Sequence, residues 1–95
     1  MTTMYESALE RAIVERTKKL GGRAFKWVSP GQAGVPDRIC IFPGGRVLFV
    51  ELKRPGLNDG RSVRQKKMFS VLEGLGCRVA RVASMREFEE AVNDL

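Results

Sequence analysis

The apolar residues of the N-terminal stretch Met4–Leu20 fall on one helical face. These apolar positions are Tyr5, Leu9, Ala12, Ile13 and Leu20. The spacing predicts an amphipathic helix. Thr3 and Glu6 stand three residues apart, as in a capping box at a helix start, and Gly21 with Gly22 is typical of a helix end.

After this helix the pattern changes to the short apolar runs of β-strands. Arg23–Val28 alternates polar and apolar residues, whereas Asp37–Phe42 and Arg46–Lys53 are almost continuously apolar. Ser29–Pro36 is rich in proline and glycine, which predicts a loop, and Pro43–Gly45 predicts a hairpin turn. The two apolar runs are therefore expected in the middle of a sheet, buried on both faces.

The C-terminal part adds two helices and a fourth strand. A loop over Arg54–Arg61 precedes a helix over Ser62–Leu75. Four apolar residues of this helix are expected to face inward: Val63, Phe69, Leu72 and Leu75. Cys77–Val82 has the pattern of a strand, and Ser84 with Glu87 three residues later predicts the capped start of a last helix.

The element order is therefore helix, three strands, helix, strand, helix. A hairpin followed by a helical crossover to another strand predicts an α/β fold with a mixed four-stranded sheet flanked by helices. We expect a single domain over residues 1–95, because this length is close to that of one ordinary domain. No apolar run approaches the length of a membrane span, and 43% hydrophobic with 29% charged residues is typical of a globular chain.

Charge and cysteine usage indicate the kind of binding partner and the cellular compartment. The formal net charge is +6. The segment from Lys53 to Lys67 contains six basic residues and one acidic residue, Asp59. A polyanionic partner would explain this clustering, although a basic surface can also serve solubility alone. Cys40 and Cys77 lack CxxC spacing, which favours buried, reduced thiols in a cytoplasmic protein over a disulfide or a zinc site.

The chain contains no histidine. This excludes Ser-His-Asp and Cys-His nucleophile systems and every metal site built on imidazole. Any hydrolysis must then depend on carboxylates, lysine and a hard cation such as Mg²⁺.

Three residues of those types cluster at the ends of the two central strands. Asp37 opens the first strand, and Glu51 and Lys53 near the end of the second point to the same face. Counting back from the hairpin turn places Asp37 opposite the region of Glu51 and Lys53. Two carboxylates that hold a divalent cation, with a lysine beside them, would suit phosphodiester hydrolysis. The alternative is a structural ion pair of Lys53 with Glu51 or Asp37.

These residues resemble a nuclease motif. The sequences GVPD at 34–37 and ELK at 51–53 resemble the PD-(D/E)xK signature, and in particular its VRR-NUC branch in the stand-alone form of phages and bacteria. That branch also has a glutamate on its first helix, matched by Glu6 or Glu10, and a glutamine at the start of the next helix, matched by Gln65. The resemblance implies a restriction-endonuclease-like core and a metal-dependent endonuclease.

The resemblance also implies roles for individual residues. The expected ligands of Mg²⁺ or Mn²⁺ are Asp37, Glu51, the backbone carbonyl of Leu52 and Glu6. Lys53 would attend the attacking water, and Gln65 would fix the lysine or the scissile phosphate. Because stand-alone members resemble symmetric dimers with two sites, the resemblance implies a homodimer that acts on four-way (Holliday) DNA junctions.

Two of these assignments have alternatives. Glu6 lies nearer the apolar stripe than Glu10, which favours Glu6 as the helix ligand, but Glu6 also fits a capping box with Thr3. Gln65 has the same ambiguity, because it stands three residues after Ser62 and fits a capping box there.

Basic residues around the motif are expected to contact the DNA backbone, or else to be merely solvated. They are Lys26, Arg54, Arg61, Arg64, Lys66 and Lys67. The competing function is a non-catalytic DNA-binding module of the same fold. A flap- or nick-directed nuclease, and an enzyme acting on RNA or nucleotides, are further alternatives.

Overall fold

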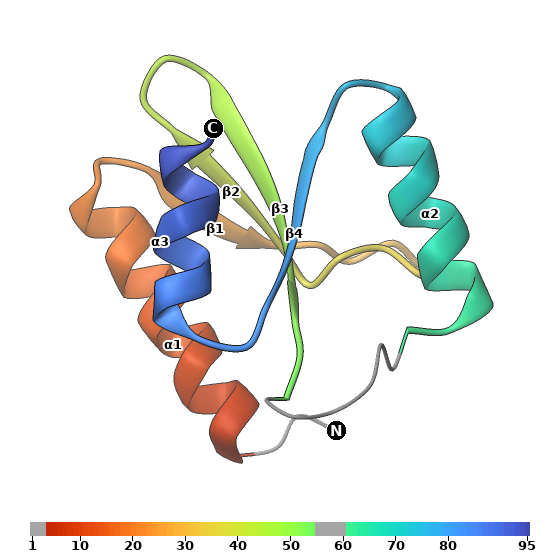
Figure 1. The fold of residues 1–95 in the computed structure, drawn as a ribbon, viewed down its shortest axis with the longest axis horizontal. Coiled ribbons are helices and arrows are strands. Elements are labelled where there is room, and N and C mark those ends of the chain that lie inside the picture. The colour runs from red at the N-terminus through yellow and green to blue at the C-terminus, as the bar shows by residue number, and fades with distance from the viewer. Residues whose placement is uncertain (1–3, 55–60) are drawn as a thin grey trace.

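The computed structural model describes residues 4–54 and 61–95, which form a sheet with helices on both of its faces (Figure 1). The elements are α1 (Met4–Lys19), β1 (Arg23–Lys26), β2 (Arg38–Phe42), β3 (Arg46–Leu52), α2 (Val63–Gly74), β4 (Arg78–Val82) and α3 (Met85–Asn93). This order confirms the predicted α-β-β-β-α-β-α arrangement. No helix in the described part of the chain has the length and apolar content needed to cross a membrane.

The sheet is mixed, as predicted. Its strand order is β1-β2-β3-β4, with β1 and β2 antiparallel, β2 and β3 antiparallel, and β3 and β4 parallel. The β2–β3 hairpin pairs Arg38 with Val50 at its open end, and the crossover through α2 pairs Leu52 with Val82. The end of β3 therefore lies between the start of β2 and the end of β4, and backbone from three segments meets there.

The main core lies between one face of the sheet and the helices α1 and α3, while α2 lies on the opposite side (Figure 1). Leu9, Ile13 and Phe88 bring helical side chains to that core, against Leu48 and Val50 of β3. These buried positions follow the predicted helical and strand spacings, so the hydrophobic pattern indicates how this face packs.

The other face of the sheet departs from the prediction. In α2 only Phe69 and Leu72 of the four expected residues are buried, whereas Val63 is 71% exposed and Leu75 76% exposed. Val63 is the first residue of α2 and Leu75 is its C-cap, so both lie at ends that extend past the packed centre of the helix. Because α2 packs against β4, it leaves the β1–β2 side of this face open, and Ile41 is 39% exposed rather than buried on both faces.

The two cysteines differ in burial. Cys40 on β2 is fully buried, and burial raises the pKa of its thiol above the usual value. Cys77 precedes β4 and is half-buried rather than buried as predicted; both are free thiols.

A carboxamide-forming reagent such as iodoacetamide attacks the thiolate, so Cys77 should be modified in the folded protein while Cys40 is protected. Peptide mass spectrometry after timed labelling measures both rates. Equal labelling of the two thiols in the native protein would contradict this burial, and labelling in denaturant supplies the control.

Candidate functional site

Asp37 is fixed by backbone on both sides of its strand. Its carbonyl oxygen accepts a hydrogen bond from the Trp27 amide at 3.1 Å, and its carboxylate Oδ2 accepts one from the Leu52 amide at 2.9 Å. The register in which Arg38 pairs with Val50 places Asp37 beside Glu51 on the next step of the hairpin. The structure thus brings together the two carboxylates that the sequence placed at the strand ends.

Glu51 is the buried member of this pair, with 9% of its surface exposed. Its Oε2 accepts a hydrogen bond from the Gln65 side-chain amide at 2.9 Å, while Oε1 is buried without a hydrogen-bond partner among the described residues. Burial, followed by the charge of Asp37, raises the pKa of Glu51 to about 8. Burial also raises the pKa of Asp37, against the opposing effect of the Leu52 amide.

This pair fits a divalent cation. Two carboxylates held together in a site of low exposure repel each other, and one oxygen has no donor, so a cation between them would remove both penalties. The amide and carbonyl of a strand residue point to the same side, so the Leu52 carbonyl faces the side of Asp37, whose carboxylate accepts from the Leu52 amide. Within residues 4–54 and 61–95 no three Cys, Asp or Glu side chains converge, so Asp37 and Glu51 form a pair and Glu6 lies outside it.

Gln65 makes the predicted capping box and also contacts Glu51, while its predicted contact with the lysine or the scissile phosphate stays a prediction. The Gln65 side-chain oxygen accepts a hydrogen bond from the Ser62 backbone amide at 3.0 Å, and the Gln65 backbone amide donates to the Ser62 hydroxyl at 3.1 Å. Together these two bonds complete a capping box at the start of α2. The remaining end of the same side chain, Nε2, donates to Glu51. Because the cap fixes the oxygen, it also turns the amino group toward the carboxylate pair.

The GVPD turn holds α2 in this place. Gly34 has φ +86°, and a Cβ at this position would lie 2.7 Å from the Arg64 carbonyl oxygen and 2.9 Å from the Gln65 amide nitrogen. The backbone of the turn therefore passes directly against the first turn of α2. Only glycine permits both the left-handed conformation and this close approach. The glycine of the motif thus positions the Gln65 side chain over Glu51.

Lys53 follows directly after β3, and its amide donates to the Val82 carbonyl at 2.9 Å. Its Nζ lies 4.0 Å from Glu87 Oε2, and this is the ion pair it makes among the described residues. The alternative of a structural pair with Glu51 or Asp37 is therefore not what the structure shows. Sequence reasoning assigned Glu87 to the cap of the last helix and missed its place beside the lysine, because nothing in local spacing relates β3 to α3.

Glu6 and Glu10 are the two glutamates of α1 that the sequence offered as a cation ligand. Glu10 forms a short ion pair with Arg38, 2.7 Å between Oε2 and Nε, in which both side chains are largely buried. Burial is the main cause of the raised pKa of Asp37, and the charges of Glu10 and Glu6 add to it. Arg38, a residue absent from the sequence-based assignment, is thus the partner of Glu10. The capping box with Thr3 lies outside the described residues.

The basic residues predicted to contact DNA occupy two places. Lys26 ends β1 and Arg54 follows β3 and Lys53, and both are exposed. The others lie in or just before the first turns of α2: Arg61, Arg64, Lys66 and Lys67. Arg61 stacks over the Phe69 ring with 5.4 Å between the guanidinium carbon and the ring centroid, so part of its role is packing. The remaining three are exposed on α2, beside the Gln65 cap.

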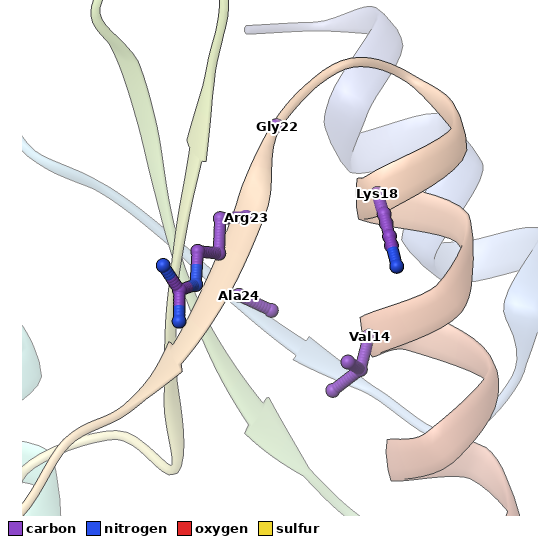
Figure 2. Close-up of a pocket in the computed structure, with 5 residues that line it drawn as sticks. All are labelled: Val14, Lys18, Gly22, Arg23 and Ala24. Atoms are coloured by element: carbon purple, nitrogen blue, oxygen red, sulfur yellow. The ribbon is translucent and has the colours of Figure 1, made fainter.

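A separate hollow of about 530 Å³ lies between α1 and β1 (Figure 2). It is lined by Val14, Lys18, Gly22, Arg23 and Ala24. Val14 and Ala24 point toward each other across it, while the Arg23 guanidinium points away from α1 (Figure 2). None of its lining residues belongs to the predicted site, so the candidate chemistry resides at the strand ends and not in this hollow.

A carboxylate pair, followed in sequence by a lysine, at the ends of central strands in a mixed sheet flanked by helices is the arrangement that the resemblance to the PD-(D/E)xK class predicts. The comparisons with known proteins agree with this class. A solved structure described as a VRR_NUC domain superposes with a TM-score of 0.85 and 25% identity, covering 96% of this chain and 97% of that chain. The resemblance to the VRR-NUC family is thereby confirmed.

A sequence relative points the same way. Over 56 residues the chain is 46% identical to the protein named "Putative nuclease p44" of Acyrthosiphon pisum secondary endosymbiont phage 1. The matched segment covers 59% of this chain and 60% of that protein, less than two thirds of its length. No family model matches the chain. Fold and relative together support a nuclease.

Proposed function

We propose that this chain is a metal-dependent DNA endonuclease that hydrolyses phosphodiester bonds. The observation that carries the proposal is the pair of half-buried Asp37 and buried Glu51, whose raised pKa values and unpartnered Glu51 Oε1 favour a bound cation, with Lys53 directly after the strand. A stable core alone would gain from replacing such groups by apolar ones, so their presence indicates function.

The residues divide the work of hydrolysis. Asp37, Glu51 and the Leu52 carbonyl would hold Mg²⁺ or Mn²⁺, and Glu6 of α1, which lies outside the pair, would complete the outer shell of the ion. When bound, the cation supplies a Lewis acid that lowers the pKa of water and offsets charge developing on the phosphate. Lys53 orients the attacking water or neutralises a phosphate oxygen, and Gln65 holds the Glu51 carboxylate in its orientation.

Charge and surface support a branched DNA substrate and a homodimer. The exposed cations Lys26, Arg54, Arg64, Lys66 and Lys67 flank the carboxylate pair and suit a phosphate backbone, while offering no arrangement for reading base edges. The open β1–β2 side of the sheet, with Phe25 42% exposed, offers apolar area for a second copy. Two sites in a symmetric dimer would cut a four-way junction on two strands, which we favour over flaps and nicks. The protein would act inside the bacterial cell.

The competing function is a DNA-binding module of this fold without catalysis. Such a module would need the cationic surface but not the buried acids, which raise the free energy of the folded state without a cation. In such a module Gln65 would be needed only for its capping box with Ser62, and its second contact, with Glu51, would have no acid to hold. These contacts favour catalysis.

Cleavage of labelled DNA tests the proposal directly. We expect wild type to cut a four-way junction with Mn²⁺ or Mg²⁺ and to be inactive with a chelator, and Lys53→Ala to lose at least about 100-fold in rate while still binding the junction. Flap and linear duplex measured in parallel identify the preferred structure. Junction binding without cutting in any metal would instead establish the binding module.

A further inference from the structure

We propose that Glu87 is the positioning residue for Lys53, so that the last helix takes part in the active site. This inference rests on the proposed nuclease function and extends it to an element that lies outside the nuclease motif. Lys53 has a flexible side chain of four carbons, and its backbone contact with Val82 leaves the ammonium group free to take many positions. A catalytic lysine that must meet a water or a phosphate oxygen needs a partner that limits those positions.

The Glu87 carboxylate is itself held firmly. Its Oε1 accepts a hydrogen bond from the Ala83 amide at 2.7 Å, and its own amide donates to the Ser84 hydroxyl at 3.2 Å. Ala83 is in turn held through its carbonyl, which accepts from the Tyr5 hydroxyl of α1. With Oε1 occupied, the free oxygen Oε2 faces Lys53 Nζ across 4.0 Å. The carboxylate is thus a fixed point, and the lysine is the group that it orients.

Helix electrostatics explain why an acid is needed here. Lys53 lies beside the N-terminus of α3, where the helix dipole carries positive partial charge and would repel an ammonium group. Glu87 in the first turn reverses the sign of the local charge. The pair is too exposed to contribute much to folding, with 34% and 42% of the two side chains exposed. Its effect should therefore be on where the ammonium lies and not on stability.

Two substitutions separate this role from helix capping. Glu87→Gln retains a side-chain oxygen for the Ala83 amide and removes only the charge that faces Lys53. We expect it to lower kcat about 10- to 100-fold with KM for the DNA and Tm nearly unchanged. Glu87→Asp should recover part of kcat. The matched control is Glu90→Gln, which removes a carboxylate of the same helix that faces the exposed Arg86 at 3.3 Å and should leave kcat and Tm nearly unchanged.

A measurement on the metal-free protein makes the test independent of cleavage. Reductive methylation with ¹³C-formaldehyde gives each lysine an NMR signal, and that of Lys53 is identified by its loss in Lys53→Arg. Glu87→Gln should move the Lys53 signal, and Glu90→Gln should leave it in place. If wild type fails to cut any DNA, the nuclease function is wrong whatever the NMR shows. If wild type cuts but Glu87→Gln changes neither kcat nor the Lys53 signal, the positioning role alone is overturned.

Discussion

Glu51→Gln should abolish cleavage and, without metal, make the protein more stable. Glutamine has nearly the shape of glutamate and can still accept from Gln65, while its amino group can donate to Asp37. It removes a buried charge next to a second carboxylate, which we expect to stabilise the metal-free fold by about 2 kcal/mol at pH 8, or about 8–16 °C in Tm. The same change removes a cation ligand, and the cleavage rate should fall at least about 1000-fold.

The increase in stability expected for Glu51→Gln should depend on pH in a definite direction. The pKa of Glu51 is raised from 4.5 to about 8 on folding, so the folded state favours the protonated acid. The stability that Glu51 contributes is therefore fully present below pH 4.5 and is lost as the pH rises toward 8. The difference in Tm between Glu51→Gln and wild type should be small at pH 5 and largest near pH 8.

Thermal unfolding with and without Mn²⁺ checks this result. At pH 8 the ion should raise the Tm of wild type and leave Glu51→Gln nearly unchanged, because a ligand stabilises only the fold that binds it. A Glu51→Gln protein that is less stable than metal-free wild type at pH 8 would show that the Glu51 charge is already compensated. The buried carboxylate pair would then be a structural cluster and not a cation site.

Much of this architecture could be predicted from the sequence because local periodicity and burial agree. The strand alternation that placed Leu48 and Val50 on one face and Glu51 on the other holds in the structure, and the hairpin turn sets the register that brings Asp37 beside Glu51. Both inferences use rules that act over a few residues. The same rules were wrong about the inward face of α2. Leu75 fits the apolar spacing, but it lies at the C-cap of the helix, where no strand covers it.

The contacts that organise the site connect elements far apart in the chain, and spacing carries no signal for them. The sequence predicts that Glu87 belongs to a helix cap, and the structure agrees, yet the fold also places Glu87 beside Lys53. The sequence predicts only that Arg38 lies in a strand, and the packing of α1 on the sheet shows that it pairs with Glu10. Gln65 shows why spacing could not decide between a cap and a contact with the carboxylates, because its side-chain oxygen accepts from Ser62 while its amino group donates to Glu51.

Gly34→Ala should cause a larger loss than an ordinary glycine substitution, because two penalties add at this position. The left-handed backbone at φ +86° disfavours any residue with a Cβ by about 1–2 kcal/mol. In addition, the new Cβ would meet backbone of Arg64 and Gln65 within 3 Å, and backbone cannot rotate away as a side chain could. We expect a total loss of about 3 kcal/mol, measured as a lower midpoint in urea unfolding.

Gly44→Ala is the matched control that isolates the contact with α2. Gly44 has nearly the same φ, +85°, but a Cβ there would meet nothing within 4 Å. It should lose only the backbone penalty and retain full cleavage activity, since it lies in the distant hairpin turn. In Gly34→Ala the displaced α2 should also carry Gln65 away from Glu51, so cleavage should fall at least about tenfold at a temperature where the variant is still folded. Equal losses of stability in the two variants would mean that α2 yields to the added methyl group. In that case the GVPD glycine would serve the turn alone, and the orientation of Gln65 would depend on its capping box with Ser62.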